Sequence, residues 1–224
     1  MAWNISTILL LILLKPWNRS EMKNTRLSLS VRLPAGYLPP RLAAVAAELA
    51  ERFSLRLYLQ AAQDLRVAEI CEEDFETVKS ILAEAGAEFA RKGSFPKPRI
   101  CSGSRYCRRG QVDTEAFSTA LLEHFGDRGV KPKLKLAIAG CPRNCSNPKL
   151  ADIGIVAGVH GFEVYAGGRA GANPVAGQKI AAGLSQHEVF TLLETLLAFH
   201  NGRMEKRVRM YQLIEDEGFP FPVL

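Results

Sequence analysis

An apolar strand pattern runs directly into two cysteines in residues 134–145, LKLAIAGCPRNC. A related stretch comes earlier in the chain, RICSGSRYC in residues 99–107. Five residues separate Cys101 from Cys107, and three separate Cys141 from Cys145. Each pair follows the end of a strand pattern and has turn-forming residues around it, so both pairs read as loops that present thiols rather than as buried segments.

Four thiols in two close pairs favour a bound metal over disulfides, because the total of five cysteines is odd and their spacing is irregular. Structural zinc sites prefer two to four residues within a pair, and the first pair is wider. Cys₄ sets also hold iron–sulfur clusters, and small residues such as Gly140 let backbone N–H groups approach the sulfurs. The sequence therefore predicts a [4Fe-4S] cluster, with a zinc site or four unrelated thiols as alternatives. Cys71 stands apart and is interpreted as a core thiol.

The composition is that of a globular protein with a basic balance. Of 224 residues 47% are hydrophobic, and Lys plus Arg exceed Asp plus Glu by six. The excess is spread along the chain and no nucleic-acid motif is present, so a polyanionic cofactor or a small oxyanion explains the charge. We expect no nucleic-acid partner. The unpaired cysteines indicate a reducing compartment, which we take to be the cytoplasm.

The chain begins with an apolar run, Ile5 to Leu14, between Trp3 and Trp17. The run is shorter than the roughly 20 residues that span a bilayer, and no basic residue precedes it as in a secretory signal. A membrane-surface anchor is the alternative. We expect no membrane span, translation that starts at Met22, and residues 1–22 as a non-native or disordered leader.

The next part, residues 23–93, reads as β-α-β-α. Alternating apolar residues predict a strand over 27–33, which Pro34-Ala35-Gly36 closes as a turn. The order predicts half of a ferredoxin-like unit. The other elements expected here are a helix over 40–53, a strand over 55–59 and a helix over 75–85 that Gly86 ends.

The breaker-rich stretch 92–98 marks a boundary, and residues 94–224 read as a second domain. Asp113 is expected to cap a helix that ends near Gly126. The other elements expected here are a strand over 134–139, a hairpin around 158–161, a helix over 185–197 opened by a capping box, and a helix over 204–216.

The cysteine motifs C-x₅-C and G-C-P-x-x-C resemble the paired cluster motifs of the siroheme/[4Fe-4S] sulfite and nitrite reductase family, in a small single-half form. The likeness extends to residues 31–36, to Asp152-Ile153-Gly154 and to Gly167-Gly168. It implies an α+β fold, a ferredoxin-like half domain followed by a [4Fe-4S]/siroheme-binding α/β domain. It also implies the six-electron reduction of sulfite to sulfide, or of nitrite to ammonia. The electrons would come from a separate donor, a ferredoxin-like protein or a reductase subunit.

The resemblance also implies roles for single residues. Cys101, Cys107 and Cys141 would hold the cluster, and Cys145 would be the thiolate shared between the cluster and the siroheme iron. Lys133 and Lys135 match the family's paired lysines at the substrate site. Their alternation with leucines predicts that both face one side of a strand, with a solvated strand edge as the alternative.

Further cations are expected because both the substrate and siroheme are anionic. Lys97 and Arg99 lie near another basic position of the family's substrate site. The candidates to pair with siroheme carboxylates are Arg105, Arg143 and Lys149.

Two departures from the family pattern reduce the number of cations expected in this anion pocket. The arginine of the family's T-x-R-Q motif is missing from residues 60–63, and Ser30 replaces a basic residue. The chain is also about half as long as a typical member, in which two halves share one site, so we expect a homodimer or a more open siroheme site. The competing function is a non-catalytic [4Fe-4S] electron-transfer protein of the same fold.

Overall fold

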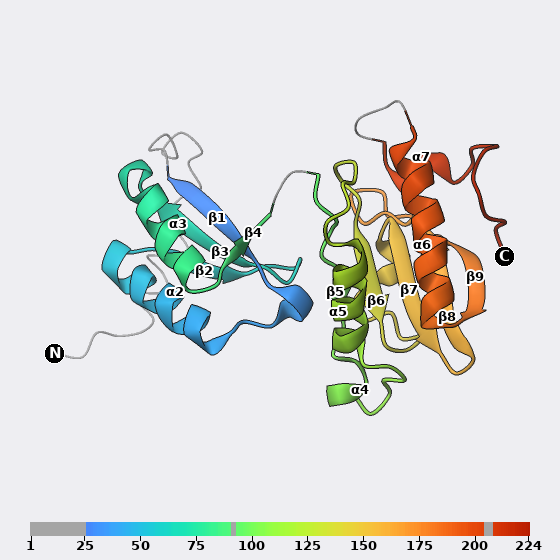
Figure 1. The fold of residues 1–224 in the computed structure, drawn as a ribbon, viewed down its shortest axis with the longest axis horizontal. Helices are drawn as coiled ribbons and strands as arrows, with labels where there is room; N and C mark the ends of the chain where they lie inside the picture. The colour runs from blue at the N-terminus through green and yellow to red at the C-terminus, as the bar shows by residue number, and fades with distance from the viewer. Residues whose placement is uncertain (1–25, 91–92, 204–207) are drawn as a thin grey trace, which may run out of the picture.

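Two sheets, one after the other along the chain, organise the protein (Figure 1). The computed structural model describes residues 26–90, 93–203 and 208–224. Within these residues the first sheet has four strands and the second has five. The expectations for residues 1–22, including the start at Met22, lie outside the described residues.

The first sheet has the strand order β2-β3-β1-β4, and its pairings are antiparallel. Along the chain the elements run β-α-β-β-α-β, which is the complete ferredoxin-like pattern. They are β1 (Leu27–Arg32), α2 (Pro40–Phe53), β2 (Arg56–Leu59), β3 (Leu65–Ile70), α3 (Phe75–Glu84) and β4 (Glu88–Phe89).

The prediction of β-α-β-α for this part was therefore incomplete. A bulge interrupts the alternation of β3, where Glu69 has a φ of 66° and the register with β1 shifts. β4 has only two residues, which is too short for a periodic pattern. Both missing strands are identified by their pairing with β1, not by their own sequences.

The helices α2 and α3 cover one face of this sheet (Figure 1). Their apolar stripes pack on the alternate strand residues that point toward them, and this forms one hydrophobic core. Fully or nearly buried members are Leu29, Val31, Leu42, Leu49, Leu65, Val67, Val78 and Leu82.

The second sheet has its strands in sequence order, β5 to β9. β5, β6 and β7 are parallel, whereas β7, β8 and β9 are antiparallel. β7 and β8 are the predicted hairpin, and β9 was not predicted. The strands are β5 (Arg99–Ile100), β6 (Leu136–Ala139), β7 (Ile153–Gly158), β8 (Gly161–Ala166) and β9 (Gln178–Leu184).

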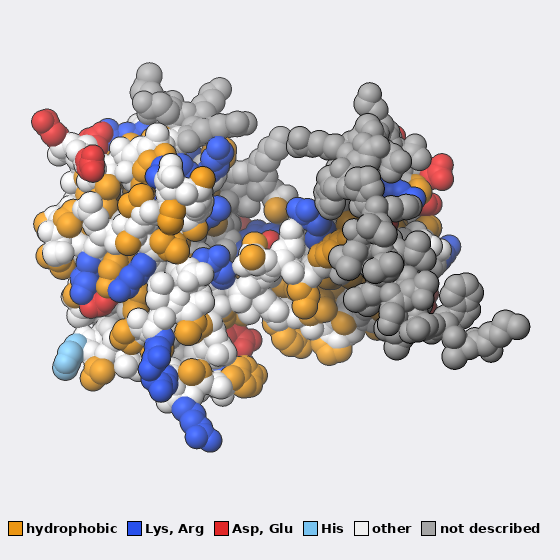
Figure 2. Space-filling model, turned by 180° about the vertical axis from the view of Figure 1, so that it is seen from behind, with side chains coloured by type: hydrophobic (Ala, Val, Ile, Leu, Met, Phe, Trp, Pro, Cys, Tyr) orange, Lys and Arg blue, Asp and Glu red, His pale blue; other side chains and the backbone are white. Residues whose placement is uncertain are grey.

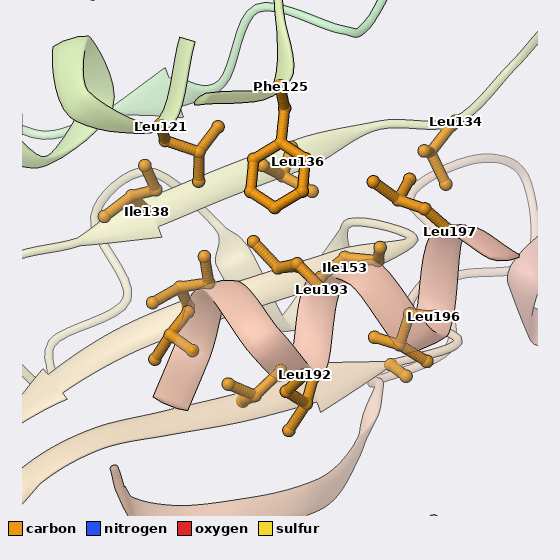
Figure 3. Close-up of a cluster of buried hydrophobic side chains, with 14 of the residues drawn as sticks. Leu121, Phe125, Leu134, Leu136, Ile138, Ile153, Leu192, Leu193, Leu196 and Leu197 are labelled. Carbon is orange, nitrogen blue, oxygen red and sulfur yellow. The ribbon is translucent and has the colours of Figure 1, made fainter. Parts of the chain in front are cut away.

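Two helices, α5 (Thr114–Phe125) and α6 (Gln186–Asn201), pack into a single core with this sheet. Figure 3 shows the Phe125 ring of α5 lying between Leu136 of β6 and Leu193 of α6. Both predicted caps are confirmed. Asp113 Oδ1 accepts from two backbone N–H groups at the start of α5, and the capping box of Ser185 and Glu188 is complete.

The predicted helix over 204–216 was wrong in extent. Residues 204–207 lie outside the described ranges, and α7 is only Met210–Leu213. The residues just before it are held by distant partners instead of by a helical turn. Val208 O faces His200 Nε2 at 3.1 Å, and Arg209 forms an ion pair with Asp152.

Asp152 is completely buried and connects three parts of the second domain. Its carboxylate accepts from Arg209 Nε at 2.7 Å and Nη2 at 2.8 Å, from Lys135 N at 3.0 Å and from Met210 N at 3.3 Å. One side chain thus joins the starts of β6 and β7 to α7. A buried carboxylate is stable only with such complete pairing.

Within the described residues, no helix combines the length and the apolar character that crossing a bilayer requires.

We predict that Asp152→Asn lowers the free energy of unfolding by about 3 kcal/mol, because it leaves the Arg209 guanidinium without its carboxylate. Urea denaturation followed by circular dichroism measures this. Glu194→Gln is the matched control: Glu194 pairs with Arg128 at 2.7 Å on the surface, and its loss should barely move the midpoint. Equal effects of the two changes would contradict the role of Asp152.

Candidate metal centre

Neighbouring parallel strands position the two cysteine pairs. Cys101 directly follows β5, and Cys141 follows β6 by two residues. β5 and β6 pair in parallel, and Cys101 N donates to Ile138 O of β6 at 3.3 Å. Because the carboxyl ends of parallel neighbours lie at the same edge of a sheet, the two cysteine loops leave it side by side.

The first loop is a compact turn between its two cysteines. It contains α4 (Gly103–Tyr106), and Cys107 N donates to Gly103 O at 2.9 Å. Ser104 N donates to Val112 O at 2.9 Å, and the Thr114 hydroxyl donates to Cys101 O. The loop is therefore anchored at both ends to the start of α5.

The second loop is shaped by two asparagines in the left-handed conformation, Asn144 (φ 60°) and Asn147 (φ 52°). Asn147 N donates to Asn144 O at 2.8 Å, and Asn144 Oδ1 accepts from Lys149 N at 3.1 Å. Asparagine tolerates this backbone conformation better than other residues with a side chain. The bonds hold Cys145 on a defined turn.

The two loops touch at glycines. Gly140 N lies 3.1 Å from Cys101 Sγ and donates to it, which is the N–H to sulfur contact expected from the sequence. A Cβ on Gly140 would stand 3.0 Å from Gly103 Cα, and one on Gly110 would stand 2.3 Å from Gly103 C. Only glycine permits this approach.

The four cysteines differ in exposure, and all are free thiols. Cys141 is buried, Cys101 and Cys107 are half-buried, and Cys145 is exposed. Among the described residues, no three of these sulfurs lie within 4.8 Å of one another, whereas tetrahedral zinc requires roughly 3.8 Å between sulfurs. Four cysteine thiols are a donor set that holds iron–sulfur clusters.

Lys133 and Lys135 lie at the opposite end of β6 from the cysteines. Both are exposed while Leu134 and Leu136 are buried, so the predicted alternation holds. The predicted strand was wrong there: β6 begins at Leu136, and Lys133 lies in a turn with a φ of 75°. The structure does not bring these lysines to the cysteine loops.

Lys97 is a structural cation between the two parts of the chain. Its side chain is only 6% exposed, and its Nζ lies 2.8 Å from Asp64 Oδ1. It also donates to the carbonyl oxygens of Leu33, Ala62 and Gln63 at 2.9, 3.1 and 2.6 Å. Burial lowers the pKa of Lys97, and Asp64 opposes that shift. With its donors engaged, Lys97 has none left for substrate.

Gln63 makes the second contact of this junction, which no pattern in the sequence predicted. Its amide donates to Ile100 O at 2.9 Å and accepts from Ile100 N at 2.8 Å, as a strand neighbour would. Ile100 directly precedes Cys101. The turn between β2 and β3 is therefore fastened beside the first cysteine.

The other basic residues predicted for the site differ in whether partners inside the chain already engage them. Arg99 Nε donates to Ser146 O at 2.7 Å, so it links β5 to the second cysteine loop. Arg105 pairs with Asp113 at 3.1 Å and Glu115 at 2.8 Å, which raises its pKa. These partners occupy Arg105, whereas Arg143 is exposed beside Cys145.

Lys149 extends over the face of Tyr165, with its Nζ 4.9 Å from the ring centroid. The Tyr165 hydroxyl donates to Glu163 at 2.7 Å, and Lys179 pairs with the same carboxylate at 2.7 Å. Burial first, and then Glu163, raise the pKa of Tyr165 to about 12. The Tyr165 hydroxyl therefore stays protonated and keeps its hydrogen bond to Glu163, with the Tyr165 ring below Lys149 Nζ.

Residues 96–220 match the family described as Nitrite and sulphite reductase 4Fe-4S domain. This range contains all four clustered cysteines and more than half of the chain. The chain belongs to the nitrite and sulphite reductase family.

Curated relatives carry both names of the family. The chain is 25% identical over 196 residues to the nitrite reductase (NADH) large subunit of Escherichia coli, covering 87% of this chain and 23% of the relative. It is 30% identical over 120 residues to an assimilatory-type sulfite reductase of Nitratidesulfovibrio vulgaris, covering 54% and 55%. The chain thus spans under a quarter of the nitrite reductase and about half of the sulfite reductase.

Two solved structures have the same fold. The NirA protein of Mycobacterium tuberculosis superposes with a TM-score of 0.68 at 22% identity, covering 86% of this chain and 38% of that one. Dissimilatory sulfite reductase I superposes with a TM-score of 0.67 at 10% identity, covering 83% and 65%.

The glycines noted in the sequence beside Asp152 and after the hairpin shape the second cysteine loop. A Cβ on Gly154 would lie 2.1 Å from Pro148 O, in the short helix η4 (Pro148–Leu150) that follows Cys145. A Cβ on Gly168 would lie 2.5 Å from Lys149 O. These glycines let β7 and the end of β8 press against η4, and Asp152 fixes the start of β7 beside them.

We predict that Ser in place of Cys101, Cys107 or Cys141 removes most of the bound iron, because each change deletes one thiolate ligand. Iron and acid-labile sulfide per chain measure this, with about four of each expected in the unchanged protein. Cys71→Ser is the matched control and should retain both. Retention of iron after any of the three changes would remove that residue from the ligand set.

We also predict that Lys97→Met lowers the free energy of unfolding by about 2 kcal/mol, because Asp64 loses its partner in a half-buried setting. Lys79→Met is the control, since Lys79 makes an exposed pair with Glu76 at 3.3 Å. Urea unfolding decides between the two roles of Lys97. If Lys97→Met left the stability unchanged but abolished turnover, Lys97 would have a role in the reaction and not in the junction.

Proposed function

We propose that the protein is a siroheme-dependent reductase of sulfite, with nitrite as the nearest variant, that works through a coupled [4Fe-4S] cluster. The exposure of Cys145 beside three recessed cysteines carries the proposal, because its sulfur is the one able to face a second cofactor. Siroheme, when bound, supplies an iron that holds the substrate while electrons arrive singly. The chain's residues provide ligation, orientation and positive charge.

Arg143 and Lys149 are the proposed partners of siroheme carboxylates. Both belong to the second cysteine loop and its continuation, and neither forms a direct ion pair among the described residues, although Lys149 lies near enough to Glu163 to help Lys179 lower the pKa of that carboxyl. Figure 2 shows Lys and Arg side chains at several separate places on this face rather than in one block.

Lys133 and Lys135 are proposed as substrate cations only in a homodimer. They are exposed at the end of β6 that lies away from the cysteines of their own chain, so a partner's copy would have to present them. The limited coverage of the relatives supports a site that one chain does not complete.

The second candidate is a [4Fe-4S] electron-transfer protein without catalysis. It is supported by the absence of an arginine from residues 60–63 and by the engagement of Lys97 with Asp64. Under either function we propose a separate electron donor, a cytoplasmic location and a domain boundary at residues 93–94.

The absorption spectrum of the aerobically purified protein separates these functions. Coupled siroheme is expected to give Soret and red bands, a lone cluster only a broad brown shoulder, and zinc no colour. With siroheme present, oxidation of reduced viologen should depend on sulfite or on nitrite. A siroheme-loaded protein with no turnover of either anion would overturn the reductase.

We predict that Cys145→Ser keeps siroheme binding but removes its electronic coupling to the cluster and lowers turnover at least a hundredfold. Loss of the shifted siroheme bands and of the cluster's redox response measures the coupling. Cys71→Ser again serves as the control. An unchanged siroheme spectrum would show that Cys145 is not the bridge.

A further inference from the structure

His200 is a buried histidine on the last turn of α6, away from the cysteine loops. It is 1% exposed, and its Nε2 lies 3.1 Å from Val208 O. Because a carbonyl oxygen only accepts, Nε2 carries the hydrogen and donates it. Nδ1 is then a bare acceptor, and it has no hydrogen-bond partner among the described residues. The site therefore fits the neutral form of the imidazole.

A second proton on this ring is unfavourable, because it adds a positive charge and an N–H without an acceptor to a buried site. The charged groups that face the ring are Asp152 at the start of β7, Arg209 before α7 and Lys131 before β6. The two cations repel an imidazolium, and the Asp152 carboxylate already accepts from Arg209. Burial is the main cause that lowers the pKa of His200, and Val208 O and Asp152 oppose it only in part.

The chain that His200 holds, residues 208–214, also contacts the second sheet, and we call it the C-terminal latch. Figure 1 shows its short helix α7 beside the end of α6. Arg209 and Met210 N both bond to Asp152. At the other end, Ile214 packs on Gly167, where a Cβ would stand 3.1 Å from Ile214 Cδ1. A helix of four residues is not stable alone, so these outside contacts hold the latch in place.

We propose that His200 is a pH-sensitive switch for the C-terminal latch: protonation of its imidazole in acid releases residues 208–214 from α6 and Asp152, while β7 stays paired in its sheet. The inference does not depend on the proposed reductase function, since it concerns a site outside the cysteine loops.

The direction of the switch follows from proton binding in the two states. In the open state the ring is hydrated and its pKa returns to the ordinary value of 6.5, whereas the closed state lowers that pKa. The open state therefore binds more protons as the pH falls below this value. The latch has its full stability above the ordinary pKa of histidine and loses stability as the pH falls through it.

Hydrogen exchange of the full chain, followed by mass spectrometry at about pH 7.5 and about pH 5.5, tests the switch. Exchange is corrected for the intrinsic rate at each pH, and peptides from residues 208–214 are compared with peptides from β7. The open fraction of the latch should rise several-fold in acid, and by at most about tenfold, because the open-state imidazole gains less than one proton over this range.

His200→Gln is the test variant. Its amide nitrogen can replace Nε2 as the donor to Val208 O, but it takes up no proton, so exchange of the latch should no longer depend on pH. His160→Gln is the matched control, since His160 is exposed in the turn between β7 and β8, and it should behave as the unchanged protein.

Three results would overturn the switch: equal exchange of the latch at both pH values, the same rise in His200→Gln, or exchange of β7 in step with the latch, which would mean global unfolding. If His200→Gln does not fold, NMR titration of the histidines in the unchanged protein decides. His200 should stay neutral at a pH where the exposed His160 and His187 are already protonated. Protonation of all three together would contradict the proposal.

Discussion

The parallel pairing of β5 with β6 is the constraint on which the metal centre depends. Four thiols from two loops reach one cluster only if the loops leave the sheet at the same edge. β5 has just two residues, so its few backbone hydrogen bonds to β6 do not by themselves secure its direction. Arg99 and Gln63 secure it from either side, through Ser146 O and through both backbone groups of Ile100.

The same short strand joins the two parts of the chain. Lys97 lies two residues before β5 and donates to Gln63 O in the turn between β2 and β3. Gln63, in that turn, bonds Ile100 at the end of β5. The turn η2 (Pro34–Gly36) also packs toward α5, with Ala35 against the core of the second part. The ferredoxin-like part is therefore fastened to the backbone that directly precedes Cys101.

The basic residues near the two cysteine loops and the junction form two groups, those with partners inside the chain and those without an ion pair. Lys97, Arg99, Arg105 and Arg209 are committed to carbonyl oxygens or carboxylates inside the chain. Arg143 and Lys149 form no ion pair within the part of the chain that the structure describes, and both lie in the second cysteine loop or directly after it. For an anionic cofactor and substrate, the second group is the one with charge to offer.

The sequence alone determined the two helix caps and the family, and it predicted the cysteine ligands, because ligand spacing, capping and hydrophobic alternation are local properties of the chain. It did not reveal β3, β4, the role of Lys97 or the place of Lys133. Those depend on partners far away in the chain: a bulged strand is recognised by its neighbour β1, and Lys97 is a junction residue only because Asp64 and three carbonyl groups converge on it. Lys133 and Lys135 alternate with buried leucines as predicted, yet the extended strand β6 stands between them and Cys141 and keeps them at its opposite end. The tertiary structure decided that Lys133 lies in a turn before this strand and not on it.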